Sequence, residues 1–465
     1  MTMRLAGAGS TEPSLESLAP EPMLTREYES RPADVFRRLR EEHGPVAPVE
    51  ILGVPVWMVL GYPQSLEILR DRQGQWSKST STWRAWAEDE IPPEWPLRAA
   101  FANDCVIVQD GWKADRLRNV WAAGLRPYQN RSSQQARDLD AQVGRYADDL
   151  ITVLSEGTAG TGYADLSAQY ARPLPLMVLN RLVGFEEGRG DELLMDVWRI
   201  VDAGPDSAEA MQRIHAALVE TIQARQAAPA DDLTSYMIAA DPALSVEDLC
   251  KELTLAVSML SDMTGTLIAN TIAEVITGDR AARASLSAGM LQETINRVAM
   301  ANPPMANLSY RFARSDVRMG RYTIAAGDPV CVSVAAAHAD PVFTDHLNAD
   351  SITSSRAHLA WSTGLHGCMG RDLATSITTV AIGRLFERFA GLQLALPADQ
   401  LPWRSSPFMR SLRSLPVEYE VAAGATVPRR PASEAPADRE PAAEPAQATR
   451  SRLWRFLRGL RKEQP

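Results

Sequence analysis

A segment near the end of the chain sets one cysteine among three glycines within ten residues. It reads WSTGLHGCMG over residues 361–370. Gly364 and Gly367 allow a tight turn, and Gly370 lets the backbone come close to a ligand because it has no side chain. The pattern predicts a loop that holds the sulfur of Cys368 against a flat cofactor containing a metal.

The residues that follow this cysteine predict a helix beginning just past it. Over residues 372–389, apolar side chains recur at helical spacing: Leu373, Ile377, Val380, Ala381, Leu385 and Phe386. The first N–H groups and the dipole of such a helix favour negative charge, so we expect a lowered pKa for Cys368 and a thiolate sulfur. A thiolate on haem iron donates electron density that favours O–O cleavage.

The same segment resembles the cysteine-loop signature of the cytochromes P-450, which it matches at Gly364, His366, Cys368 and Gly370. Trp361 and Ser362 stand where that family more often has Phe and Gly. The resemblance spans roughly residues 30–422. It implies haem b held through Cys368, with His366 donating a hydrogen bond to a propionate and Trp361 shielding the sulfur. The alternative is a small buried cysteine in a glycine-rich turn.

Two arginines stand at positions that resemble the family's propionate ligands. They are Arg118, in residues 110–118, and Arg311, in residues 310–317. The His that the family often has four residues before the first arginine is Ala114 here. A guanidinium suits a buried carboxylate because it cancels the charge and fixes the orientation together. A solvated surface role is the alternative for each arginine alone.

The Glu-x-x-Arg pair of the family is missing before the Asn-Pro-Pro sequence at 302–304. Arg297 takes the position of Glu, and Met300 takes the position of Arg. Glu293 and Arg297 are spaced for a different pair, one turn earlier. Absence of the usual pair is compatible with haem binding, because removing both charges together can be nearly neutral in free energy.

Residues 246–277 predict one long helix, which in the resembling fold passes over the distal haem face. Oxygen-activating members carry an acid followed by Thr in this helix. Asp262 fits the acid, but Met263 takes the Thr position, and a thioether cannot relay protons. We expect Asp262 and Thr264 to supply protons, with Ser261, water or a substrate hydroxyl as other candidates. A solvent-facing carboxylate is the alternative for Asp262.

The composition predicts a chain with a large hydrophobic core. The 465 residues are 45% hydrophobic and 23% charged, with four cysteines at no paired or metal-type spacing. This cysteine usage favours a reducing, cytoplasmic compartment. The formal net charge of -10 disfavours nucleic acid as the main partner, and the sequence has no apolar run long enough to span a membrane.

The periodicities predict a mainly α fold with small β-sheets, as in the cytochrome P-450 fold. Predicted helices cover residues 33–42, 65–71, 132–155, 173–183, 191–201, 208–226 and 246–277, and predicted strands cover 46–51, 54–60, 318–324 and 329–334. The predicted organisation is a flexible arm over 1–30, a haem domain over 31–422, a Pro/Ala/Glu-rich linker over 423–449 and a basic amphipathic helix over 450–465.

The C-terminal segment over residues 450–462 places leucines and Phe456 at helical spacing among arginines. Such a helix binds an anionic membrane surface or an acidic protein, which predicts a peripheral attachment. Packing of the helix back on the acidic body is the alternative.

The sequence gives few signals that identify the substrate or the electron donor. Trp83, Trp86 and Trp95 either cap an apolar ligand pocket or pack a long loop onto the body. No nicotinamide or flavin motif is visible, so electrons would come from a ferredoxin or flavin reductase.

These observations together predict a haem-thiolate monooxygenase that oxidises a small apolar organic molecule with O2. The alternative is a haem protein that no longer oxygenates and acts as a sensor or signalling component. The missing Thr and the missing ion pair favour this alternative. The chain also resembles, at residues 173–176 and 401–404, a bacterial subgroup that lacks the pair and is associated with signalling.

Overall fold

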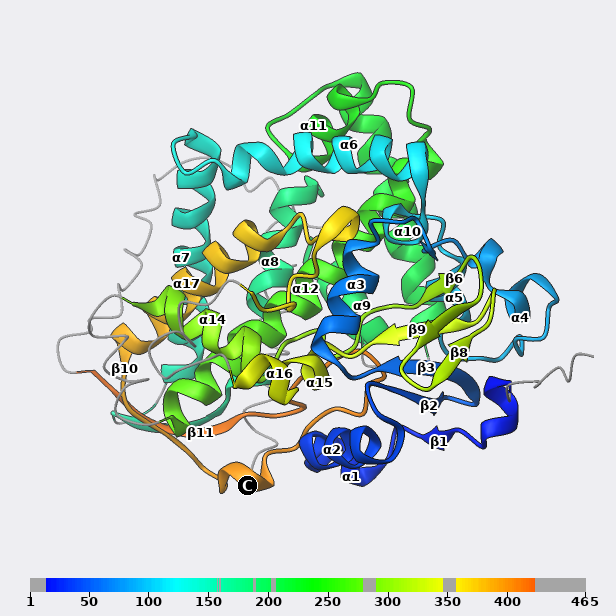
Figure 1. The fold of residues 1–465 in the computed structure, drawn as a ribbon. Coiled ribbons are helices and arrows are strands. Elements are labelled where there is room, and N and C mark those ends of the chain that lie inside the picture. Colours follow the sequence, from blue (N-terminus) through cyan, green and yellow to red (C-terminus); the bar gives the residue numbers. More distant parts are fainter. Residues whose placement is uncertain are drawn as a thin grey trace, which may run out of the picture.

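The computed structural model describes residues 14–156, 158, 160–186, 190–201, 206–278, 290–345 and 357–422. Helices dominate this part of the chain, and its strands form sheets of six, three and two strands (Figure 1). This is the mainly α architecture with small β-sheets that the sequence predicts. The predicted linker and C-terminal helix lie outside the described residues.

The longer helices are α2 (Pro32–His43), α3 (Tyr62–Arg70), α6 (Gly111–Gln129), α7 (Gln134–Ser155), α8 (Pro173–Val183), α9 (Gly190–Val201), α10 (Ser207–Ala227), α11 (Leu233–Ala240), α12 (Val246–Thr277), α14 (Leu291–Ala301) and α17 (Arg371–Arg388). Most of the longer helices match those predicted from apolar periodicity, whereas α6, α11 and α14 were not among the predicted helices. The short ones are η1 (Leu15–Leu18), α1 (Arg26–Ser30), η2 (Thr80–Thr82), α4 (Arg84–Ala87), α5 (Arg98–Ala102), η3 (Val106–Val108), η4 (Ser167–Ala171), α15 (Val334–His338), α16 (Pro341–Thr344), η5 (Gly364–His366) and η6 (Ala398–Gln400).

The six-stranded sheet brings distant segments together in the order β1-β2-β3-β9-β6-β4. Its strands are β1 (Glu21–Pro22), β2 (Val46–Ile51), β3 (Val54–Val59), β9 (Pro329–Val332), β6 (Arg311–Ala313) and β4 (Trp76–Ser77). The other sheets are β10 (Phe389–Leu394), β11 (Pro416–Val421) and β5 (Thr161–Asp165), and the hairpin of β7 (Val317–Met319) and β8 (Tyr322–Ile324). The predicted strand over 318–324 is therefore two strands, which turn at Gly320 with φ +61°.

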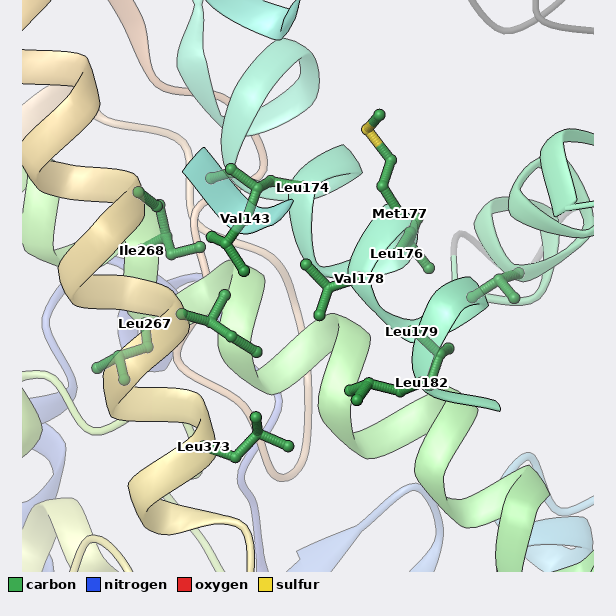
Figure 2. Close-up of a cluster of buried hydrophobic side chains, with 14 of the residues drawn as sticks. Val143, Leu174, Leu176, Met177, Val178, Leu179, Leu182, Leu267, Ile268 and Leu373 are labelled. Carbon is green, nitrogen blue, oxygen red and sulfur yellow. The ribbon is translucent and has the colours of Figure 1, made fainter. Parts of the chain in front are cut away.

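The long helix α12 runs through the middle of the molecule and packs against α8, α10 and α17 (Figure 1). Apolar side chains from α7, α8, α12 and α17 form one buried cluster around it (Figure 2). Gly265 of α12 lies against the turn before α8, where a Cβ atom would be 3.0 Å from the carbonyl oxygen of Ala171. The close contact between these two segments therefore requires glycine.

Residues 14–30 differ from the predicted flexible arm, because they pack on the body. β1 pairs in parallel with β2, and Leu15, Met23 and Tyr28 are at most 7% exposed. The Tyr28 hydroxyl accepts a hydrogen bond from Asn307 Nδ2 at 2.8 Å. These three buried side chains anchor the segment to the body. The Pro- and Glu-rich composition of the segment gave no sign of them.

The position of the missing Glu-x-x-Arg pair is filled by other contacts. Arg297 of α14 forms an ion pair with Glu274 of α12, with 2.9 Å between Nε and Oε1. The side chain of Met300 is buried, and its carbonyl oxygen lies 3.0 Å from Nδ1 of His338 in α15. Thus α14 is still fixed to its neighbours, but through α12 and α15.

The two helical glycines Gly265 and Gly383 give opposite expectations for substitution by alanine. Gly383→Ala, in α17, meets no atom within 4 Å, so it should stabilise the fold by up to about 1 kcal/mol through helix propensity. Gly265→Ala should destabilise it by about 1–2 kcal/mol, because the backbone atoms it meets cannot move aside easily. Urea unfolding of both variants measures the difference, and a stabilised Gly265→Ala would contradict the packing argument.

Candidate functional site

A cavity of about 310 Å³ lies between α12 on one side and the segment around Cys368 on the other. Residues from α6, β6 and the β4 edge close one end of it. That end is polar and basic, whereas the walls are mostly Leu, Met, Ala and Val. Leu182, Leu267 and Leu373 belong both to the cavity wall and to the buried cluster of Figure 2, so the core directly supports the cavity.

The segment of residues 361–370 forms the loop that its glycines predict. The Cys368 N–H donates to the Trp361 carbonyl at 2.8 Å, closing the loop. Gly364 has φ +72°, and a Cβ there would lie 2.3 Å from the Leu69 carbonyl oxygen of α3. Gly370 lines the cavity, with nothing within 4 Å of its ideal Cβ position.

Ser362 is an unusual residue for its backbone conformation. It has φ +57°, in the left-handed region that costs a non-glycine residue about 1–2 kcal/mol. Its N–H donates to the Leu359 carbonyl at 2.8 Å. The loop keeps the shape that the family more often builds with glycine, at the expense of this local strain.

Cys368 exposes its sulfur to the cavity, and the surrounding protein raises its pKa above the ordinary value. Burial is the main cause, and it outweighs the N–H groups of Gly370 and Arg371 and the charges of Arg118 and Arg371, which lower the pKa. The helix terminus therefore does lower the pKa of Cys368 as predicted, but this effect is smaller than the opposing effect of burial. A bound metal ion would itself deprotonate the thiol.

Helix α6 holds this loop from the side. Arg118 Nη2 donates to the Gly367 carbonyl at 3.2 Å, and Gln129 Nε2 donates to the Met369 carbonyl at 2.6 Å. Both contacts link the helix that carries a predicted propionate ligand to the residues next to Cys368. The site thus depends on one fixed relation between α6 and the loop.

The basic end of the cavity collects Lys78, Arg118, Arg311 and His366. Arg311 is 5% exposed, and burial lowers its pKa to about 10. Burial and the charges of Arg311 and Lys78 lower the pKa of His366 to about 3, so this imidazole is neutral at neutral pH. No Asp or Glu is among the described residues that line the cavity.

These residues fit haem, which is flat, carries two carboxylates and needs an axial ligand. The excess of positive charge at one end suits the carboxylates, and the open thiol suits the iron. Arg311 supports the fit most directly, because no hydrogen bond or ion pair links its buried guanidinium to another described residue. The predicted ligands Cys368, His366, Arg118, Arg311, Trp361 and Gly370 all line this cavity, and Gly364 shapes the loop.

On the opposite wall, Thr264 points an unused hydroxyl into buried space. Its Oγ1 has no hydrogen-bond partner, whereas Thr254, Ser261 and Thr271 of the same helix donate to the carbonyl four residues earlier. Thr264 and Met263 both line the cavity. A free hydroxyl is therefore available one residue beyond the position where the resemblance expects it.

Asp262 is not a cavity-lining residue. Its Oδ1 lies 3.1 Å from Nη1 of Arg404, and the two side chains are 13% and 20% exposed. The structure thus separates the two predicted proton suppliers, with Thr264 at the cavity and Asp262 in an ion pair beside it.

The three tryptophans pack a loop rather than cap the cavity. Trp83 contacts Trp86, Trp95 and Phe312 through their rings, and Trp83 and Trp95 are at most 4% exposed. None of the three tryptophans lines the cavity. The structure therefore supports the interpretation that these tryptophans pack a long loop onto the body, not that they cap a ligand pocket.

Sequence reasoning missed one residue that lines the cavity, Lys78, and two charged residues outside its lining, Arg404 and Glu252. Lys78 lines the basic end, Arg404 pairs with Asp262, and Glu252 accepts hydrogen bonds from Val106 N at 2.9 Å and Trp121 Nε1 at 2.6 Å. Burial raises the pKa of Glu252 to about 7 despite these bonds. Because Glu247, Asp248 and Lys251 lie close by in the same helix, no local sequence signal marks Glu252.

None of the described helices meets the length and hydropathy needed to cross a membrane. Within the same residues, no group of three or more His, Cys, Asp or Glu side chains is arranged to hold a metal ion.

Comparisons with known proteins give a consistent result, although no protein-family model matches the chain. It is 30% identical over 393 residues to cytochrome P-450 107B1 of Saccharopolyspora erythraea, covering 82% of this chain and 93% of the relative. It is 29% identical over 408 residues to 2-hydroxy-5-methyl-1-naphthoate 7-hydroxylase of Streptomyces carzinostaticus, covering 83% and 95%.

A solved structure of similar sequence has the same fold. CYP154A1 from Streptomyces coelicolor A3(2) superposes with a TM-score of 0.71 at 30% identity, covering 83% of this chain and 97% of the other. CYP154C4 from a Streptomyces species gives a TM-score of 0.77 at 25% identity, covering 87% and 99%.

Proposed function

This chain belongs to the cytochrome P-450 superfamily, binds haem b and is a haem-thiolate monooxygenase of organic molecules, and we propose that its substrate is small and apolar. One cavity in the chain supports this conclusion most directly. It is lined by Cys368, and its basic end has no acidic residue among the described lining residues. The iron of the bound haem supplies the activation of O2.

We propose that the residues around the haem divide into an axial ligand, anchors and loop-shaping residues. Cys368 would supply the sulfur that binds the iron. Arg118 and Arg311 hold the two carboxylates, and neutral His366 donates a hydrogen bond to one of them. Trp361 covers the sulfur, Gly364 permits the turn against α3, and Gly370 leaves room for the ring.

Proton delivery is proposed to run through the Thr264 hydroxyl. Thr264 lines the cavity and its Oγ1 has no hydrogen-bond partner, which supports this role, since proton transfer requires a donor within hydrogen-bond reach of the reacting oxygen. We propose that Asp262 exchanges protons with Thr264 through water while Arg404 holds its carboxylate. A hydroxyl on Thr264 argues against the alternative of a haem protein that has lost oxygenase activity and acts as a sensor.

A small apolar substrate suits the distal wall. Val106, Ile107, Ala256, Met259 and Leu260 line it, and apolar walls with few polar groups are typical of pockets for organic ligands. The relative from Streptomyces carzinostaticus hydroxylates a naphthoate, as its name states. We therefore propose an aromatic or alicyclic natural product as the substrate class.

The remaining assignments are proposals from the sequence. A ferredoxin or flavin reductase is the proposed electron donor, and the cytoplasm is the proposed location. The chain is proposed to belong to the bacterial subgroup without the Glu-x-x-Arg pair, in keeping with the Arg297–Glu274 contact. The proposed haem domain covers residues 31–422, and the packed residues 14–30 extend it toward the N-terminus.

Carbon monoxide binding to the reduced protein tests the proposed ligand. We expect the red-shifted Soret band of thiolate ligation, with product formed only when substrate, a redox partner and NADPH are all present. Cys368→Ala should abolish this band, and Cys331→Ala, at a buried cysteine of β9, is the matched control. An unchanged absorption spectrum in Cys368→Ala would refute the ligand assignment, and the band without turnover on a broad compound panel would favour a sensor.

Substitution of Thr264 tests the proposed proton path. Thr264→Val keeps the shape but removes the hydroxyl, so we expect product formation to fall by about tenfold or more, with electrons diverted to hydrogen peroxide. Thr264→Ser should retain most of the activity, and Met263→Leu is the control at the neighbouring cavity residue. Product and peroxide are measured per NADPH consumed, and equal coupling in Thr264→Val and wild type would contradict the role.

The tail over residues 450–465 is proposed as a basic amphipathic helix that attaches the protein to an anionic membrane surface or an acidic protein. Deleting it should release the protein from vesicles that contain anionic lipid while leaving the carbon monoxide spectrum unchanged. Sedimentation with anionic and with neutral vesicles measures this attachment. Equal binding of the full chain and the truncated chain to anionic vesicles would exclude the membrane role.

A further inference from the structure

Lys78 is a buried lysine that none of the assignments above uses. It directly follows β4, its side chain is 5% exposed, and it lines the basic end of the haem cavity. Its Nζ donates to the Ser309 carbonyl at 3.1 Å, the Ser309 Oγ at 2.7 Å and the Tyr310 carbonyl at 2.8 Å. All three acceptors are uncharged.

The pairing of β4 with β6 brings Lys78 next to Arg311. Trp76 lies opposite Ala313 and Ser77 lies opposite Phe312, so the same antiparallel register places Lys78 opposite Arg311. Directly opposite side chains of the same charge destabilise a sheet. Asp110 lies near both cations and Asp71 lies near Arg311, but neither carboxylate lines the cavity. An anion bound in the cavity would offset the positive charge that faces it.

Asp110 fixes the backbone of Lys78 but leaves its ammonium group free of a carboxylate contact. The Asp110 carboxylate accepts hydrogen bonds from Ser77 Oγ at 2.5 Å, the Lys78 N–H at 3.0 Å and Arg314 Nη2 at 2.8 Å. Asp110 precedes α6, the helix that carries Arg118. One carboxylate thus ties β4, β6 and α6 into a frame that directs three cations toward one end of the cavity.

We propose that Lys78 is a third cationic anchor for the haem carboxylates, acting together with Arg311. This inference rests on the proposed haem site and adds to it a ligand that lies far from the cysteine loop and from both predicted arginines in the sequence. A buried ammonium without a counter-charge is costly, and a bound carboxylate removes this cost. Hydrogen bonds to the Ser309 and Tyr310 carbonyls alone do not require a full charge.

Proton uptake on binding follows from this arrangement. Burial and the charge of Arg311 lower the pKa of Lys78 to about 7, against the opposing effects of Asp110, Cys331 and Cys105. The ammonium also faces His366, which is neutral. A bound carboxylate raises the pKa of Lys78, so above neutral pH the complex holds a proton that the free protein has lost. Affinity should therefore fall as the pH rises above about 7.

Metal-free protoporphyrin IX and its dimethyl ester are the probes that isolate this contact. Neither contains iron, so binding does not draw a proton from Cys368, and the ester has no carboxylates. Binding to the full-length apoprotein is followed by porphyrin fluorescence from pH 6.5 to 8.5. Lys78→Met removes the charge at similar length, Lys78→Arg keeps it, and Lys113→Met, at a surface lysine paired with Asp104, is the matched control.

We expect Lys78→Met to weaken protoporphyrin IX binding by about tenfold or more and to leave binding of the ester unchanged. Lys78→Arg and Lys113→Met should stay close to wild type. Equal weakening for acid and ester would instead assign Lys78 a purely structural role, and no weakening would overturn the proposal outright. Circular dichroism of the apoprotein checks that each variant folds.

The wild-type chain alone provides a second test if Lys78→Met fails to fold. Its affinity for the acid should fall with rising pH, by up to about tenfold per unit, more steeply than its affinity for the ester. Parallel slopes would refute the proposal. A failed anchor is distinguishable from a failed haem site, because the carbon monoxide band of the wild-type holoprotein depends on Cys368 and not on Lys78.

Discussion

A concentration of positive charge at one end of the cavity is the constraint around which the site is organised. Lys78, Arg118 and Arg311 meet there, and the described lining contains no acid. Buried charges of one sign are stable only when a ligand or a neighbour of opposite charge completes them. Asp110 links the segments that carry these side chains through its bonds to Ser77, the Lys78 N–H and Arg314, and the haem carboxylates are proposed to supply the balancing charge.

Cys368, the proposed haem ligand, is likewise not held in its charged form by the protein alone. Burial raises the pKa of Cys368 more than the helix terminus and Arg118 lower it, so the protein alone does not fix the thiolate. What the protein fixes is the position of the sulfur, through the Trp361 hydrogen bond, Gly364 against α3 and the contacts of α6 with the loop. The loop that carries Cys368 is therefore shaped by protein contacts alone.

The departures from the usual family pattern have local replacements. Met263 takes the position of a hydroxyl residue, and the next residue, Thr264, lines the cavity and has a buried hydroxyl without a hydrogen-bond partner. The Glu-x-x-Arg pair is absent, and Arg297 binds Glu274 of α12, while α14 also contacts α15 through Met300.

The sequence by itself determined the cysteine loop, the long helix over Val246–Thr277 and the mainly α fold, because turn glycines and apolar periodicity are local properties of the chain. It did not indicate that residues 14–30 pack on the body, that Asp262 pairs with Arg404, or that Lys78 lies opposite Arg311. These contacts join residues that are far apart in the chain, and a lysine or an arginine has the same local signature on a surface as in a cavity. Only the tertiary structure decided which charges are buried together, since burial and pairing depend on strand register and helix packing rather than on neighbouring residues.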